Sequence, residues 1–137
     1  MAPIQTERGS TVKVVEVSDG SCGFCTRIIA QMEDAARVRI TITSDCEAAA
    51  KWGEEIGRVD WRESLGSRPL ESHLWQSAAE MLRHRSCPVL TGVLRAIEAE
   101  VGATKPAKIM IRFLPGENSD RRQGRPAGNE NPPSKNE

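Results

Sequence analysis

Four cysteines are the residues of this chain whose type and spacing could do chemistry. Cys22 and Cys25 form a tight C-G-F-C pair, Cys46 follows in S-D-C, and Cys87 follows in H-R-S-C-P-V. Thiolates bind zinc and iron–sulfur clusters, and they are also the nucleophiles of thiol–disulfide exchange. Three separate stretches of chain therefore carry thiols that could converge on one point. The pattern predicts a thiol-centred site without naming a reaction.

The leading hypothesis is metal or cluster binding. Cys46 and Cys87 each precede a helical stretch, where the helix dipole and the unpaired N–H groups favour a thiolate. A metal requires deprotonated sulfur, so this placement suits coordination. We expect Cys22, Cys46 and Cys87 to bind an iron–sulfur cluster or zinc, with Cys25 or His84 completing the set of ligands.

Two alternatives stay open at this point. Cys22 and Cys25 have the spacing of a thioredoxin-like redox dithiol, in which the C-x-x-C lies between a strand and a helix. Alternatively, the cysteines are inert, because free thiols are commonly small buried hydrophobes in a structural or interaction domain. None of these hypotheses names a substrate, so the sequence predicts no particular enzymatic activity.

The first elements that position the cysteines are expected to be strands. Residues 11–17 are β-branched and short, which is typical of a strand. Residues 38–43 alternate between apolar and polar side chains, which indicates a strand with one buried face. Residues 24–36 fit a helix or a strand. Their β-branched positions favour a hairpin whose turn lies near residues 34–37.

The remaining regular elements are expected to be mostly helices. The composition turns helical after Cys46, and Gly57 is a plausible stop. Ser72 is suited to cap the next helix. Pro88 fits the first turn of a further helix that ends at Gly102.

The complete order predicts an α+β fold. A minor helix is expected within residues 59–65, and the alternating residues 109–114 predict a closing strand. The resulting β-β-β-α-α-β order indicates a small, mostly antiparallel sheet with helices packed on one face. We expect a flexible N-terminus at residues 1–10, one domain at 11–114, and a disordered polar tail at 115–137.

The composition argues against several classes of partner. The chain has 19 basic and 19 acidic residues, so no net charge steers it toward nucleic acid or an anionic membrane. It contains no Tyr and only two Phe, which disfavours a base-stacking surface. The N-terminus has no apolar signal-peptide core and no apolar run is long enough to span a membrane. We therefore expect a cytoplasmic protein; no protein partner is indicated.

The cysteine motifs resemble those of a small bacterial and archaeal family of unknown function. The similarity lies in C-G-F at 22–24, S-D-C at 44–46 and C-P-V at 87–89, followed by a closing I-x-I-x-F stretch. It covers roughly residues 12–113. The resemblance implies a cysteine site made by the first cysteine of C-G-F-C together with those of the other two motifs. Cys25 departs from the family pattern, which weakens a redox role for the pair.

Overall fold

The computed structural model describes residues 12–19 and 21–116, which form two separate units. The first unit is Met1–Ala107 and the second is Lys108–Glu137. All the helices and strands described below belong to the first unit. The expected flexible N-terminus and nearly all of the expected polar tail lie outside the described residues.

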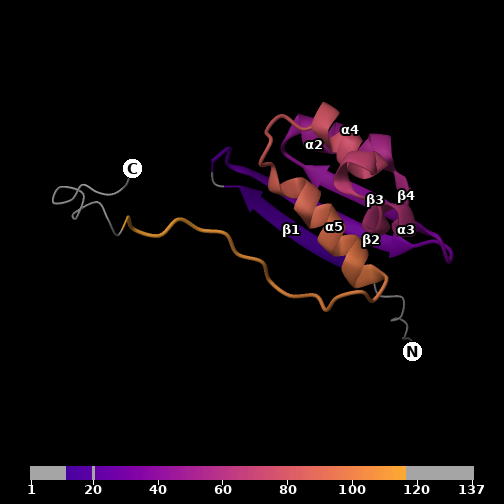
Figure 1. Ribbon diagram of the computed structural model, residues 1–137. Helices are drawn as coiled ribbons and strands as arrows, with labels where there is room; N and C mark the ends of the chain where they lie inside the picture. Colours follow the sequence, from indigo (N-terminus) through magenta and orange to yellow (C-terminus); the bar gives the residue numbers. More distant parts are fainter. Residues whose placement is uncertain (1–11, 20, 117–137) are drawn as a thin grey trace, which may run out of the picture. The chain divides into compact units, whose positions relative to one another are not determined.

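The sheet of the first unit is antiparallel throughout. Its strands are β1 (Lys13–Asp19), β2 (Phe24–Met32), β3 (Arg37–Ser44) and β4 (Arg58–Asp60), paired in chain order (Figure 1). The predicted hairpin of β2 and β3 is confirmed, and β1 and β2 also pair antiparallel. The second hairpin turns at Asp34, whose carboxylate accepts hydrogen bonds from two backbone N–H groups of the turn.

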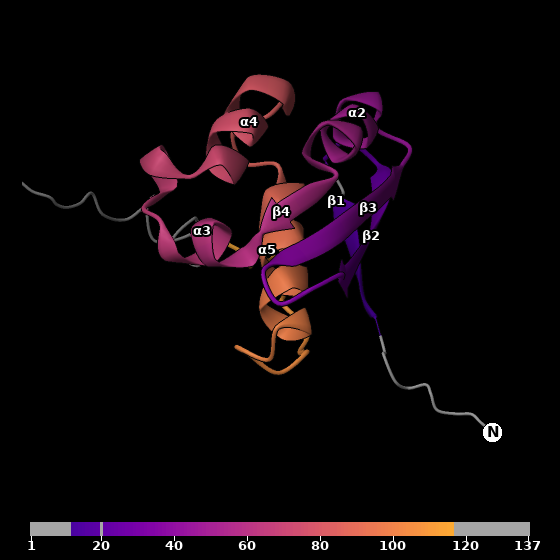
Figure 2. The same ribbon diagram turned by 90° about the vertical axis from the view of Figure 1, so that its right-hand side faces the viewer.

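The helices follow the first three strands. They are α2 (Glu47–Ile56), α3 (Trp61–Gly66), a 3₁₀ turn (Pro69–Glu71), α4 (His73–Met81) and α5 (Pro88–Glu100). Figure 2 shows α3, α4 and α5 on the same side of the sheet. The described part of the chain contains no helix that is both long and apolar enough to cross a membrane.

Alternation along the strands separates an inner face from an outer face. In β2, Thr26, Ile28 and Ala30 are buried, whereas their neighbours in sequence are more exposed. Helix α5 packs on β1 and β2 so closely that a Cβ at Gly92 would lie 2.8 Å from the Ile28 Cδ1 atom. The core therefore lies between the inner face and the helices. Its buried apolar members are Ile28, Ala30, Val38, Ile40, Ala49, Trp52, Ile56, Val59, Leu74, Ala78, Val89, Val93, Ala96 and Ile97.

The predicted α+β class is confirmed, and two elements differ from the expectation. The three-residue strand β4 was not predicted; it forms because Val59 pairs with Val38 of β3. The predicted closing strand at 109–114 is wrong, since no residue from 105 to 116 is in a strand or helix. Alternation of apolar side chains favours an extended chain, but a strand also needs a neighbour for its backbone hydrogen bonds.

Candidate functional site

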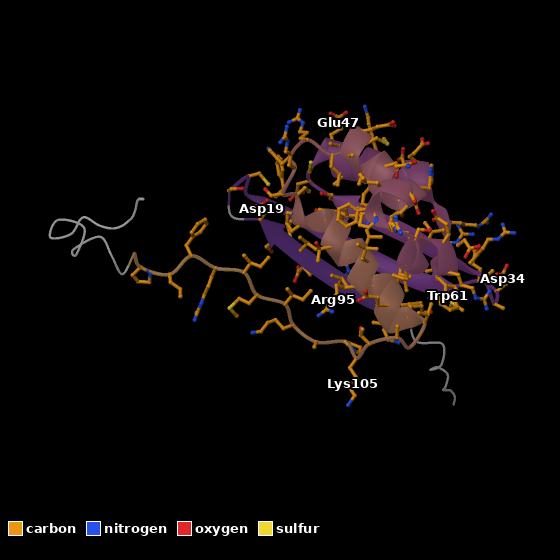
Figure 3. The ribbon with its side chains drawn as sticks, in the orientation of Figure 1. Asp19, Asp34, Glu47, Trp61, Arg95 and Lys105 are labelled. Atoms are coloured by element: carbon orange, nitrogen blue, oxygen red, sulfur yellow. The ribbon has the colours of Figure 1, made fainter. Side chains whose placement is uncertain are left out.

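Three of the four cysteines line one pocket at the end of the inner face. The pocket has a volume of about 200 Å³, and Cys22, Cys46 and Cys87 are among its lining residues. It lies where β1 ends, where β2 begins, and where α2 and α5 start. Figure 3 shows Asp19, another lining residue, at this end of the sheet near the start of α5. Three separate stretches of chain therefore each contribute a cysteine to this pocket.

The turn between β1 and β2 positions Cys22. The Asp19 carboxylate accepts hydrogen bonds from the backbone N–H of Ser21 at 2.9 Å and from its hydroxyl at 2.6 Å. Gly23 follows with a φ of 76°, a conformation that glycine adopts without steric cost. The Cys22 thiol lies 3.8 Å from the Asp19 carbonyl oxygen. This closed turn places Cys22 between the end of β1 and the start of β2.

The start of α2 positions Cys46. Cys46 is the N-cap residue, and its backbone N–H donates to the Ser44 hydroxyl at 3.0 Å. That hydroxyl is also 2.7 Å from the Thr26 hydroxyl on the adjacent strand. The chain that leaves β3 is thus tied to β2 just before it enters the helix. Cys46 is half-buried at the pocket wall.

The start of α5 positions Cys87. Cys87 is the N-cap residue, Pro88 occupies the first turn, and the Cys87 N–H donates to the His84 carbonyl oxygen at 3.2 Å. Neither Cys46 nor Cys87 caps its helix through a side-chain hydrogen bond. Both sulfurs thus remain available to a ligand.

The electrostatics at Cys87 differ from the expectation of a depressed pKa. Burial raises the pKa of the Cys87 thiol, and the Val89 N–H at the start of α5 opposes this shift. The neighbouring Cys46, Asp19 and Cys22 raise the pKa further, because each would repel a thiolate there. Cys46 and Cys22 are therefore each near enough to Cys87 to affect its pKa. In the metal-free protein, the thiol form of Cys87 is favoured.

This shift predicts how Cys87 reacts as the pH changes. Alkylation by iodoacetamide requires the thiolate, so the half-maximal rate at Cys87 should fall at a higher pH in the folded chain than in the urea-unfolded chain. The pKa of Cys87 in the folded state exceeds the ordinary value of 9.0. The folded state therefore binds more protons than the unfolded state as the pH rises above 9.0. The stability contributed by this thiol is present below pH 9.0 and is lost as the pH rises through the folded pKa.

Mass spectrometry of the alkylated peptides measures this pH dependence residue by residue. The rate at Cys87, normalised to the same peptide in urea, is the quantity to compare. A half-maximal pH at or below that of the unfolded chain would contradict the expected direction.

The structure places Cys25 apart from the other three cysteines. Cys25 lies on β2 opposite Ser18, on the outer face, and its thiol is 3.6 Å from a Glu16 carboxylate oxygen. The C-x-x-C spans a turn between two antiparallel strands, not a strand-to-helix junction. The thioredoxin-like hypothesis is therefore wrong about its structural context. The side chain of Cys25 is also turned away from the pocket that it was expected to help line.

Three charged or titratable side chains join the cysteines at the pocket. His84, which the sequence suggested as a ligand, lines it together with Asp19 and Arg83. Hydrogen bonds from Ser21, and then the nearby His84, hold the pKa of Asp19 below its usual range. The sequence alone assigns this carboxylate no role. Its position directly before the first cysteine motif is the signal that was available.

A ready-made site for a single metal ion is not found. Among residues 12–19 and 21–116, no group of three His, Cys, Asp or Glu side chains is arranged to hold one. A structural zinc site needs its ligands about 2.0–2.3 Å from one centre. The expectation of an iron–sulfur or zinc site thus gains no direct support from the geometry.

The fold and the pocket define a small α+β protein whose candidate site is a cluster of three cysteines at one end of an antiparallel sheet. Residues 13–113 match the model of a family described as "Family of unknown function (DUF6951)". The chain belongs to this family. No curated protein and no solved structure was found to match it.

Proposed function

We propose that this protein binds an iron–sulfur cluster through Cys22, Cys46 and Cys87. The observation that carries the proposal is their convergence: three separated stretches bring these cysteines to one pocket. The influence of Cys22 and Cys46 on the pKa of Cys87 supports their mutual proximity. Thiolates are the protein ligands that such clusters use.

The pocket has room for a group larger than one ion. Its volume of about 200 Å³ exceeds several times the roughly 30 Å³ that a water molecule occupies in the liquid. In a four-iron cluster each thiolate binds a different iron, so the sulfurs stand farther apart than they do around a single ion. Val17, Leu82 and Val89 supply apolar wall, which limits the access of water to a cluster.

Neutralisation of the mutually repelling thiolates would favour the binding of cations in the pocket. Thiolates at Cys22, Cys46 and Cys87 would repel one another and the Asp19 carboxylate, and this repulsion contributes to the raised pKa of Cys87. Iron would relieve the repulsion by neutralising the thiolates. Cluster uptake should therefore release protons and strengthen as the pH rises toward 9.

Anaerobic reconstitution tests the proposal. Purified full-length protein is incubated with ferrous iron, sulfide and a thiol reductant, desalted, and assayed for bound iron, bound sulfide and visible absorption. We expect a brown protein that retains iron and sulfide in near-equal amounts. A folded protein that stays colourless and iron-free would support the inert-thiol alternative. A protein that binds zinc without sulfide would contradict the cluster.

A further inference from the structure

A fourth sulfur ligand does not reach the pocket in this fold. The Cys25 thiol lies on the outer face of the sheet, 3.6 Å from a Glu16 carboxylate oxygen and 3.9 Å from the Ser18 hydroxyl. Turning it inward would require a one-residue slip of β2, which would move the buried Thr26 and Ile28 to the outer face. A fourth protein ligand of a four-iron cluster would therefore be a donor other than cysteine.

The polar residues of the pocket differ in their ability to serve as that donor. Arg83 has no lone pair to offer, because its guanidinium only donates hydrogen bonds. One Asp19 carboxylate oxygen is engaged by both Ser21 donors. Within the described part of the chain, the His84 imidazole makes no hydrogen bond, and its side chain is exposed at the pocket mouth. His84 is the donor that remains free to bind.

His84 also has an acidic neighbour that suits a metal-bound imidazole. His84 and Asp19 both line the pocket, so the imidazole and the carboxylate border the same space. A histidine that binds a metal through one nitrogen commonly donates its other N–H to a carboxylate, which fixes the tautomer and the ring orientation. Ser21 holds the Asp19 carboxylate in place for this role.

We infer that His84 is the fourth ligand of the cluster held by Cys22, Cys46 and Cys87, and that Asp19 is its positioning residue. The inference rests on the proposed cluster. One imidazole nitrogen donates its lone pair to the fourth iron, and the other nitrogen donates its N–H to Asp19. The imidazole enters as a neutral ligand, so the site carries one negative charge fewer than a site with four thiolates. Lower negative charge raises the reduction potential of a cluster.

Pulsed electron paramagnetic resonance of the reduced, reconstituted full-length protein tests the ligand directly. A nitrogen bound to a cluster iron gives a strong nitrogen hyperfine coupling, which thiolate ligands do not give. We expect this coupling in the wild-type protein and in His73→Ala, which alters the only other histidine of the chain. We expect its loss in His84→Ala and in His84→Cys. The His84→Cys protein should keep its cluster at wild-type loading, because a thiolate replaces the imidazole.

The outcomes separate this inference from the proposed function. A cluster that loads on the wild type without nitrogen coupling overturns the role of His84 and leaves the cluster proposal standing. Nitrogen hyperfine coupling that survives in the His84→Ala protein also overturns the role of His84. Failure of the wild type to retain any cluster overturns the proposed function, and the ligand assignment with it.

The positioning role of Asp19 has a matched control at the other end of the sheet. Asp34 also accepts two hydrogen bonds from its own turn, at 2.9 and 2.8 Å. We expect Asp19→Asn to lower cluster affinity roughly tenfold and to change the size of the nitrogen coupling, whereas Asp34→Asn changes neither. Equal effects of the two variants, or an unchanged coupling in Asp19→Asn, would reduce Asp19 to a turn residue.

Discussion

Replacing Cys22, Cys46 or Cys87 singly with alanine is expected to abolish stable cluster binding, whereas Cys25→Ala should load like the wild type. Each of the first three residues contributes to the shared pocket, and the fourth lies on the opposite face of the sheet. Loss of an outer-shell partner alone typically costs about 10–100-fold in metal affinity. Loss of a ligand should cost at least the upper part of that range.

Cys25→Ala is the matched control for these variants, because it removes the same atoms from the same C-x-x-C turn. Bound iron and sulfide per chain are measured after identical anaerobic reconstitution. Thermal unfolding of each metal-free variant, followed by circular dichroism, shows whether the fold is retained. A Cys25 variant that loses its cluster as completely as the other three would exclude the proposed ligand set. If the alanine variant of Cys22, Cys46 or Cys87 retained iron and sulfide at the wild-type level, that residue would be excluded as a ligand.

The hairpin of β2 and β3 was predictable because local residue preferences agree with the packing. Val38, Ile40 and the polar residues between them alternate, and the structure buries those two. The segment that contains Phe24 was ambiguous in period, and its β-branched residues decided correctly for a strand. The Asp34 carboxylate stabilises the turn by accepting two backbone hydrogen bonds, as aspartate side chains commonly do in turns.

The two misjudged segments depend on partners that the sequence does not reveal. Strand β4 has only three residues and was expected to start a helix. It is stabilised by pairing with β3, and its final residue, Asp60, then caps α3 through its side chain. Residues 109–114 have the alternation of a strand yet no strand forms there. In both cases the decisive interaction is long-range pairing, which local preferences do not encode.

The sequence indicated which residues line the candidate site better than it indicated the direction of the pKa shift at Cys87. The positions of Cys46 and Cys87 before helical stretches were visible in the sequence, and both are N-cap residues. The effect of the α5 start on Cys87 is present but is outweighed by burial and by neighbouring acidic groups. Those terms depend on which residues meet in space. The side-chain direction of Cys25 likewise follows from strand pairing, which one-dimensional spacing leaves open.

Replacing Trp52 with alanine is expected to lower the free energy of unfolding by about 3–5 kcal/mol. Trp52 is 0 % exposed, and it is the largest of the fully buried side chains in the described chain. Small domains have total stabilities of about 5–15 kcal/mol, so this loss is a large fraction of the whole. Urea unfolding followed by far-ultraviolet circular dichroism measures it without relying on tryptophan fluorescence.

Trp75→Ala is the control, because the Trp75 side chain is 39 % exposed at the start of α4. Its removal should cost less than about 1 kcal/mol. Similar losses of unfolding free energy in Trp52→Ala and Trp75→Ala would show that burial does not explain the contribution of Trp52 to stability. Since α2 carries Trp52 and begins directly after Cys46, the Trp52 variant should also hold Cys46 less firmly at the pocket.

Trp52→Phe separates the packing of this side chain from its hydrogen bond. The indole N–H donates to the Ser77 hydroxyl at 3.0 Å, and that hydroxyl donates onward to the Leu74 carbonyl oxygen at 3.1 Å. Phenylalanine removes the donor but leaves the Ser77 hydroxyl with its Leu74 partner, so no buried polar atom is left unsatisfied. The cost should therefore be only about 1–2 kcal/mol. A loss as large as that of Trp52→Ala would mean that the hydrogen bond, rather than the packed volume, joins α2 to α4.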